Sequence, residues 1–141
     1  MDETGEGRRL WHIGAVADRT ELSLRTLRHY DEIGLVRPFQ RSEGGFRLYS
    51  EQDIERILLI RRMKPLDFTL EQMRELLDIT HDVSQPDPPT EAQEKLRELE
   101  AIAIERRTAL ERKVAMADEF LARLRSLTSA GPRDEDGGRT G

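Results

Sequence analysis

Basic and aromatic side chains are concentrated between residues 23 and 49, and their chemistry suits an anionic partner. This stretch reads SLRTLRHYDEIGLVRPFQRSEGGFRLY. Guanidinium groups form bidentate hydrogen bonds with phosphate oxygens and with the base edge of guanine. Residues 8–64 contain twelve Lys or Arg against eight Asp or Glu, a local surplus of +4, although the whole chain carries a net charge of -5. Because phosphate binding depends on the local field, this distribution favours nucleic acid as the partner.

Two short helices are predicted to position these side chains. The first spans residues 13–20, and Ser23 is a good N-cap for the second. We expect Leu24, Leu27 and Tyr30 to point inward. The outer face of the second helix then carries four polar or basic side chains: Arg25, Thr26, Arg28 and His29. Two short helices joined in this way form a helix-turn-helix, whose second helix enters the major groove of DNA.

A β-hairpin is predicted directly after this helix pair. Gly34 ends the second helix, and residues 39–41 and 46–49 then alternate apolar and polar side chains around Ser-Glu-Gly-Gly. Arg41 and Arg47 lie on the two strands near the tip of the hairpin. A basic amphipathic helix or a charged hairpin is common in proteins that do not bind DNA. The two together indicate a winged helix-turn-helix, with the hairpin as the wing.

Further helices should follow, each with a local start signal. Ser50 with Asp53, Thr69 with Gln72, and Thr90 with Gln93 have the spacing of capping boxes. The last helix is too long for a small globule, and its apolar residues recur every three or four positions, as in a coiled-coil seam. We therefore predict a homodimer. The predicted dimerisation residues are Leu96, Leu99, Ala103, Leu110, Val114, Ala117, Leu121 and Leu124.

The predicted fold is mainly α, with a winged helix-turn-helix head, a small β-hairpin wing and a long coiled-coil dimerisation helix. Five segments are expected along the chain. Residues 1–10 form a flexible arm, 11–79 the DNA-binding domain, 80–89 a proline-rich hinge, 90–128 the dimerisation helix, and 129–141 a disordered tail. An alternative to self-pairing is a last helix that folds back on its own domain.

Composition excludes several kinds of chemistry. The chain has no cysteine, which excludes disulfides and thiolate metal sites. We find no phosphate loop, no His-Glu-x-x-His pair and no nucleophile elbow, and only three histidines, so we expect neither an enzyme nor a cofactor nor a metal site. No apolar run is long enough to span a membrane, and the N-terminus lacks an apolar signal core. A cytoplasmic, nucleoid-associated protein is expected.

Residues 12–79 resemble the MerR family of bacterial transcription regulators. The most specific part is SLRTLRHYDEIGLV followed by RSEGGFRLYSEQD. The resemblance implies DNA contacts by Ser23, Arg25, Thr26, Arg28 and Tyr30 of the recognition helix, and by Arg41, Arg47 and Tyr49 of the wing. His29 stands where family members often have a second tyrosine.

The resemblance also implies a function. Members bind a near-palindromic promoter site as antiparallel coiled-coil dimers and distort the spacer DNA to realign it for the RNA polymerase holoenzyme. Thiolate metal sensing is excluded here, and no large drug-sensing domain follows the coil. The alternative is an adaptor that uses head and coil to bind a transcription partner such as a sigma factor. A protein-binding head would not need arginines on both helix and wing. In a gel-shift assay, a flat response between low and physiological salt would count against DNA binding.

Overall fold

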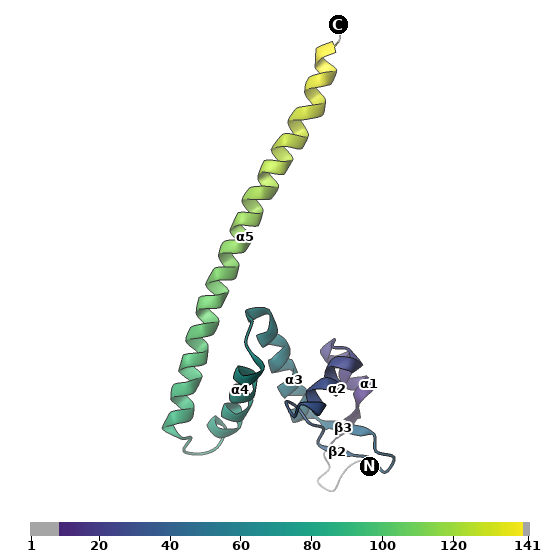
Figure 1. The fold of residues 1–141 in the computed structure, drawn as a ribbon, viewed down its shortest axis with the longest axis vertical. Helices are drawn as coiled ribbons and strands as arrows, with labels where there is room; N and C mark the ends of the chain where they lie inside the picture. The colour runs from purple at the N-terminus through teal and green to yellow at the C-terminus, as the bar shows by residue number, and fades with distance from the viewer. Residues whose placement is uncertain (1–8, 140–141) are drawn as a thin grey trace. The chain divides into compact units, whose positions relative to one another are not determined.

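The computed structural model describes the backbone of residues 9–139 and the side-chain environments of residues 9–130. The elements follow the order β1, α1, α2, β2, β3, α3, a 3-10 turn η1, α4 and α5 (Figure 1). The chain divides into two compact units, residues 1–99 and residues 100–141, and the second consists of the outer part of α5. No helix in the described part of the chain is long and apolar enough to cross a membrane.

Helices α1 (Ile13–Thr20) and α2 (Leu24–Glu32) form the predicted helix pair. Helix α1 ends where Glu21 takes a left-handed conformation with φ of 61°. Helix α2 begins at Ser23, whose hydroxyl accepts a hydrogen bond from the Thr26 amide at 3.0 Å. This bond satisfies one of the free N–H groups at the helix start, which is why the N-cap prediction from local sequence is confirmed.

Gly34 directs the chain out of α2. It has φ of +73°, and the Leu35 amide donates to the Tyr30 carbonyl at 2.8 Å. A left-handed residue just past a helix, with amides bonded back to its last carbonyls, is the common glycine C-terminal motif. Leu35 and Val36 are then buried, as expected for a segment that returns to the core.

The wing is an antiparallel pair of strands, β2 (Gln40–Arg41) and β3 (Arg47–Ser50). Gly45, with φ of +83°, permits the turn between them. The sequence did not predict β1 (Leu10–His12), which pairs with the other edge of β3 and gives the strand order β1-β3-β2. Leu10 therefore belongs to the head and not to a flexible arm.

Two capping boxes start the next helices, as predicted. Ser50 and Asp53 exchange side-chain and backbone hydrogen bonds at the start of α3 (Glu51–Met63), and Thr69 and Gln72 do so at α4 (Leu70–Val83). Between them η1 (Lys64–Leu66) accommodates Pro65. On α2, the prediction that Leu24 points inward was wrong, because its side chain is 38% exposed.

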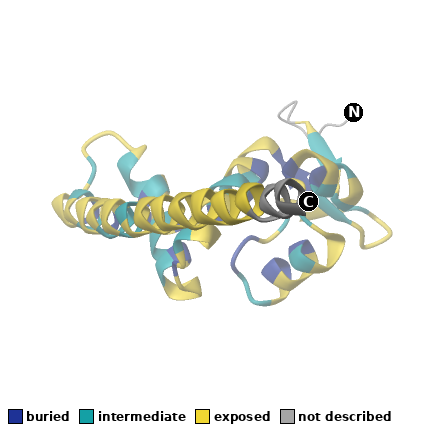
Figure 2. Cartoon of the chain, turned by 90° about the horizontal axis from the view of Figure 1, so that it is seen from above, coloured by how far each residue is buried: buried dark blue, intermediate teal, exposed yellow. Residues whose placement is uncertain are grey.

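The core of the head lies between the helix pair, the sheet and α3. Fully buried aliphatic side chains come from four different helices of this unit, α1 to α4, which fixes the rotation of each helix about its axis. The largest of them are Leu27, Ile54, Ile57, Ile60, Leu77, Val16 and Val36. Figure 2 shows the buried residues gathered in the head, whereas exposed residues run along most of α5.

Helix α5 spans Thr90–Arg139, and its ends differ from the prediction. Helix α4 continues to Val83, so the hinge is shorter than residues 80–89 because the helix-breaking prolines begin only at Pro86. Thr90 is the first residue of α5, and the Pro89 carbonyl accepts from the Gln93 amide at 3.3 Å. The helix also runs past residue 128, where the predicted tail was to begin; residues 140–141 of that tail, like residues 1–8 of the predicted arm, lie outside the described residues.

Candidate nucleic-acid interface

The outer face of α2 presents basic side chains to solvent. Leu27 is 1% exposed and Tyr30 is 4% exposed, so the helix is held with this side against the core. At 100° per residue, Arg25, Arg28 and His29 must then lie on the open side, and all three are exposed. Among the residues that the structure describes, neither Arg25 nor Arg28 forms an ion pair.

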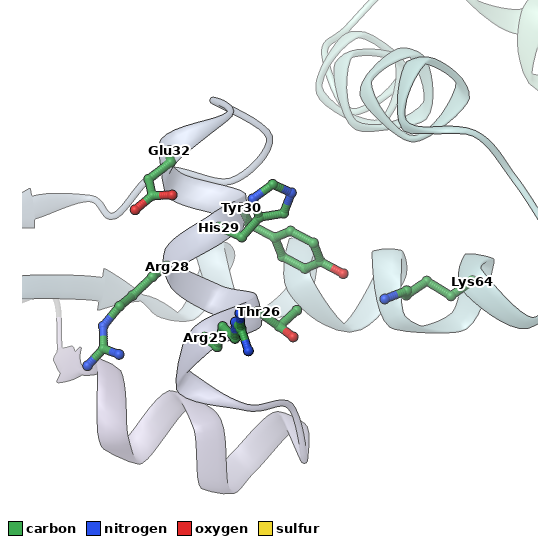
Figure 3. Close-up of a pocket in the computed structure, with 7 residues that line it drawn as sticks. All are labelled: Arg25, Thr26, Arg28, His29, Tyr30, Glu32 and Lys64. Atoms are coloured by element: carbon green, nitrogen blue, oxygen red, sulfur yellow. The ribbon is translucent and has the colours of Figure 1, made fainter.

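An open concavity of about 530 Å³ borders this face (Figure 3). Its lining includes Arg25, Thr26, His29 and Tyr30 from α2 and Lys64 from η1. Arg28 and Glu32 of α2 also line it, and in Figure 3 the Lys64 ammonium group extends toward α2. Lys64 thus adds a second cationic element to the surface.

From the sequence, Lys64 was one of three cations that could equally balance the helix dipole or reach the DNA backbone. It closes α3 in a basic run with Arg61 and Arg62, and such a run is equally explained by the negative end of the helix dipole. The sequence signal was present, but it did not say which of the three cations faces α2. The structure separates them, since Arg61 pairs with Glu21 at 2.8 Å whereas Lys64 faces the concavity.

Ser23 and Thr26 use their hydroxyls on each other. The Ser23 hydroxyl donates to Thr26 Oγ1 at 3.0 Å and accepts from the Thr26 amide at the same distance. The structure therefore gives Ser23 a clear role as the cap of α2. The Thr26 hydroxyl retains its own hydrogen, which it can donate to a ligand in the concavity that it lines.

Tyr30 and Tyr49, which the resemblance implies as DNA contacts, are buried in the structure. Both rings are in the core, with Tyr49 only 1% exposed, and both hydroxyl oxygens are buried. Tyr49 lies on β3 opposite Trp11 of β1, so the unpredicted third strand covers one side of it. Burial, which disfavours the phenolate, raises the pKa of Tyr49 to about 12.

The wing arginines are brought to a carboxylate of α2. Arg41 and Arg47 are directly opposite each other in the register of β2 and β3. Arg41 Nη2 and Arg47 Nε donate to the same oxygen, Oδ2 of Asp31, at 2.8 and 2.7 Å. Burial of Asp31 by itself opposes ionisation, but the hydrogen bonds from Arg47 and Arg41 prevail and hold its pKa below the ordinary value. The sequence did not single out Asp31.

An ion-pair cluster joins the N-terminal strand to α3. Glu51 accepts from Trp11 Nε1 and from Arg19 Nη1, both at 2.8 Å. The guanidinium carbons of Arg9 and Arg19 lie 4.3 and 4.8 Å from the centre of the Trp11 ring. Hydrogen bonding from Arg19 is the main reason that the pKa of Glu51 is lowered. These arginines are used in holding β1 and α1 on the start of α3.

The predicted dimerisation residues fall into two environments. Leu99 is 5% exposed and lies within the first unit, together with the buried Ala92. Nearby, Lys95 Nζ lies 3.6 Å from Glu75 of α4. Leu99 therefore packs inside its own protomer, and assigning it to the seam was wrong because helical spacing does not reveal which surface covers a residue.

The rest of the predicted seam is more open. Leu96, Leu110, Val114, Leu121 and Leu124 are between 38% and 60% exposed. Ala103 is partly exposed and Ala117 is exposed. The sequence stripe also left out several exposed apolar side chains of α5: Ile104, Met116, Phe120 and Leu127. Among the described residues, no group of three or more His, Cys, Asp or Glu side chains could hold a metal ion.

A helix pair with a basic outer helix and a charged hairpin, followed in the chain by a long helix, defines a winged helix-turn-helix DNA-binding protein. The chain belongs to the MerR family. Residues 12–79 match the model described as MerR HTH family regulatory protein, and residues 54–127 match that described as MerR, DNA binding.

Relatives of this chain agree with the assignment. Heavy metal-dependent transcription regulator 2 of Rhizobium meliloti (strain 1021) is 31% identical over 116 residues, which cover 82% of this chain and 73% of that protein. The crystal structure of a MerR family regulator from Bacillus cereus covers 94% of this chain and 87% of its own, with 26% identity and a TM-score of 0.57.

A third comparison concerns the fold alone. HiNmlR, described as a MerR family regulator lacking the sensor domain, bound to promoter DNA, has a TM-score of 0.69 at 20% identity and covers 86% of this chain and 95% of its own. The chain is thus a MerR-family DNA-binding transcriptional regulator and not an enzyme.

Proposed function

We propose that this regulator binds a near-palindromic promoter site as a homodimer, with α2 in the major groove and the wing on the adjacent backbone. The observation that carries the proposal is the exposed basic face of α2 beside the Lys64 concavity. Arg25, Arg28, His29 and Thr26 are the groups placed to meet base edges and phosphates. Arg41 and Arg47 are proposed to contact phosphates from the wing, and Lys64 to contact a phosphate beside α2.

The homodimer is proposed from the exposed apolar stripe of α5. Leu110, Val114, Leu121 and Leu124 are spaced by three, four or seven residues and are 39–60% exposed. Helices with such a stripe bury it against a second helix of the same kind. A twofold dimer presents two recognition helices, so its operator would have matching half-sites.

We further propose that the bound dimer bends or twists the promoter spacer and so controls RNA polymerase. This step rests on membership of the family and on the fold shared with a regulator described as bound to promoter DNA. Distortion of DNA needs contacts on both half-sites, which the two heads of a dimer would supply.

The test is selection of bound duplexes from a random library by the purified protein. The expected product is a pair of inverted half-sites, and binding to it should weaken steeply between low and physiological salt because phosphate contacts release counterions. Lack of an enriched sequence, together with binding that ignores salt, would contradict the proposal.

Arg25→Ala is the matched variant. If Arg25 reads a guanine, the variant should lose ~1–3 kcal/mol of affinity for the selected duplex and relax its preference at one position. Equal weakening on every duplex would assign Arg25 to a phosphate instead. Glu32→Gln is the comparison on the same helix: Glu32 also lines the concavity, but its replacement removes a negative charge, so this variant should bind every duplex as tightly as the wild type or more tightly.

A further inference from the structure

Arg41 and Arg47 form an unfavourable pair in the wing. They are directly opposite in the register of β2 and β3, and like charges at such positions repel. The wing is also short, since β2 has two residues and β3 has four. Few ladder hydrogen bonds therefore hold the two arginine-bearing strands together, and another group must compensate the repulsion.

Asp31 is that group, and it comes from the recognition helix. One carboxylate oxygen accepts from both guanidinium groups, at 2.8 Å from Arg41 and 2.7 Å from Arg47. Asp31 lies in the last turn of α2 and is 8% exposed, whereas the Arg41 side chain is 47% exposed. The contact thus ties the end of α2 to both strands of the wing.

These contacts orient the arginines without exhausting them. A guanidinium has five N–H groups, and the bonds to Asp31 use Nη2 of Arg41 and Nε of Arg47. The other N–H groups of each arginine are not used in these bonds. Because the carboxylate is fixed on α2, the direction of those groups is set relative to the same helix that carries Arg25 and Arg28.

We propose that Asp31 is a positioning residue for DNA recognition: it holds the two wing arginines at a fixed place relative to α2, so that helix and wing meet one duplex together. The inference rests on the proposed DNA interface. It makes an anionic residue favourable for binding an anionic ligand. Simple charge counting predicts the reverse, because removing a negative charge beside DNA should strengthen binding.

The test compares Asp31→Asn with Glu32→Gln. Both changes remove one negative charge from the same turn of α2, but Glu32 is exposed and its side chain is not one of the two arginines' hydrogen-bond partners. Asp31→Asn is expected to weaken binding to the selected duplex by about tenfold or more and to leave binding to unrelated duplex within about threefold. Glu32→Gln is expected to bind the selected duplex as tightly as the wild type, or more tightly. Equal or tighter specific binding by Asp31→Asn would overturn the proposal.

Replacing Asp31 in protein that lacks both wing arginines separates its role in positioning them from any role in folding. In protein that carries Arg41→Gln and Arg47→Gln, adding Asp31→Asn should change specific affinity by less than about twofold, since there is nothing left to position. A further tenfold loss there would show that Asp31 acts by another route. If Asp31→Asn does not fold, Arg41→Gln alone serves, because it breaks one arm and should speed hydrogen exchange of the Ser42 amide, which donates to Phe46 at 2.8 Å. Unchanged exchange of that amide would contradict the proposal.

Failure of the inference is distinct from failure of the proposed function. Wild-type protein that shows no salt-dependent binding to any duplex would contradict the DNA interface itself. Wild-type protein that binds normally, beside an Asp31→Asn variant that binds equally well, would contradict only the role of Asp31.

Discussion

Helical spacing assigns Leu99 of α5 to the dimer seam, whereas the structure buries it within its own protomer. Its side chain is 5% exposed and belongs to the first compact unit. Truncating a buried leucine to alanine removes transfer free energy and leaves a cavity, at a cost of ~2–5 kcal/mol. Leu99 lies at the edge of its unit, so the lower end applies. A loss of about 2 kcal/mol should reduce the melting temperature of a domain of this size by roughly 8–16 °C.

Leu96→Ala is the matched control for Leu99→Ala. The two leucines are one turn apart on the same helix, but Leu96 is 38% exposed. Its truncation should change the free energy of unfolding by about 0.5 kcal/mol or less. The assays are thermal unfolding by circular dichroism at one protein concentration and sedimentation equilibrium of the folded protein. Leu99→Ala should unfold early and still associate like the wild type.

The opposite pattern would place Leu99 in the dimer seam. In that pattern Leu99→Ala has the melting temperature of the wild type, but its dimer dissociates at protein concentrations at which the wild-type dimer persists. Leu99 would then belong to the dimer seam and not to the core of its own protomer. The helical spacing of the apolar residues would then predict the role of Leu99 better than its burial within one protomer does.

Three other predictions concern the stripe, the cap of α3 and a buried tyrosine. Leu110→Asp puts a carboxylate into the exposed stripe and should abolish both the dimer in sedimentation and binding to the selected duplex; tight binding by a demonstrated monomer would contradict the dimer proposal. Ser50→Ala removes the bond from the Asp53 amide at 3.1 Å and should lower the free energy of unfolding in urea by ~1 kcal/mol, so an unchanged midpoint would argue against the cap. Tyr30→Phe leaves Tyr49 as the only tyrosine, and ultraviolet titration should place its pKa at about 12, raised by burial. Because the folded pKa of Tyr49 exceeds its unfolded value of about 10, the neutral phenol stabilises the fold below pH 10, and this stabilisation is lost as the pH rises through 12. Phenolate formation near pH 10 in folded protein would contradict the prediction.

Elements with local start signals were predictable from the sequence. Ser23, Ser50 and Thr69 each cap the helix that the sequence assigned to them. A cap is a bond between residues three apart, so all the necessary information is contiguous. The wing follows from the alternation around Gly44 and Gly45 for the same reason. Strand β1 had no such signal, since its hydrogen bonds go to β3, about forty residues away.

Tertiary contacts decide where the tyrosines and Lys64 of the candidate site lie. Tyr30 and Tyr49 have the chemistry of phosphate contacts, but whether a tyrosine lies in the core or on the surface depends on what covers it. For Tyr49 the cover includes β1. The sequence identified Lys64 as a cation near a helix end. The direction of its side chain depends on where η1 begins after Met63.

The wing shows why basic residues in a sequence overstate the charge that faces DNA. Arg41 and Arg47 read as two free cations, yet one carboxylate is shared between them, so the cluster has a net charge of +1. Arg25 and Arg28 form no ion pair among the described residues, and their charge remains available. Attraction to phosphate should therefore depend more on α2 than on the wing. Asp31 neutralises one positive charge of the wing, but it fixes the two arginines relative to α2. This fixed geometry favours one register of helix and wing on the duplex over all others.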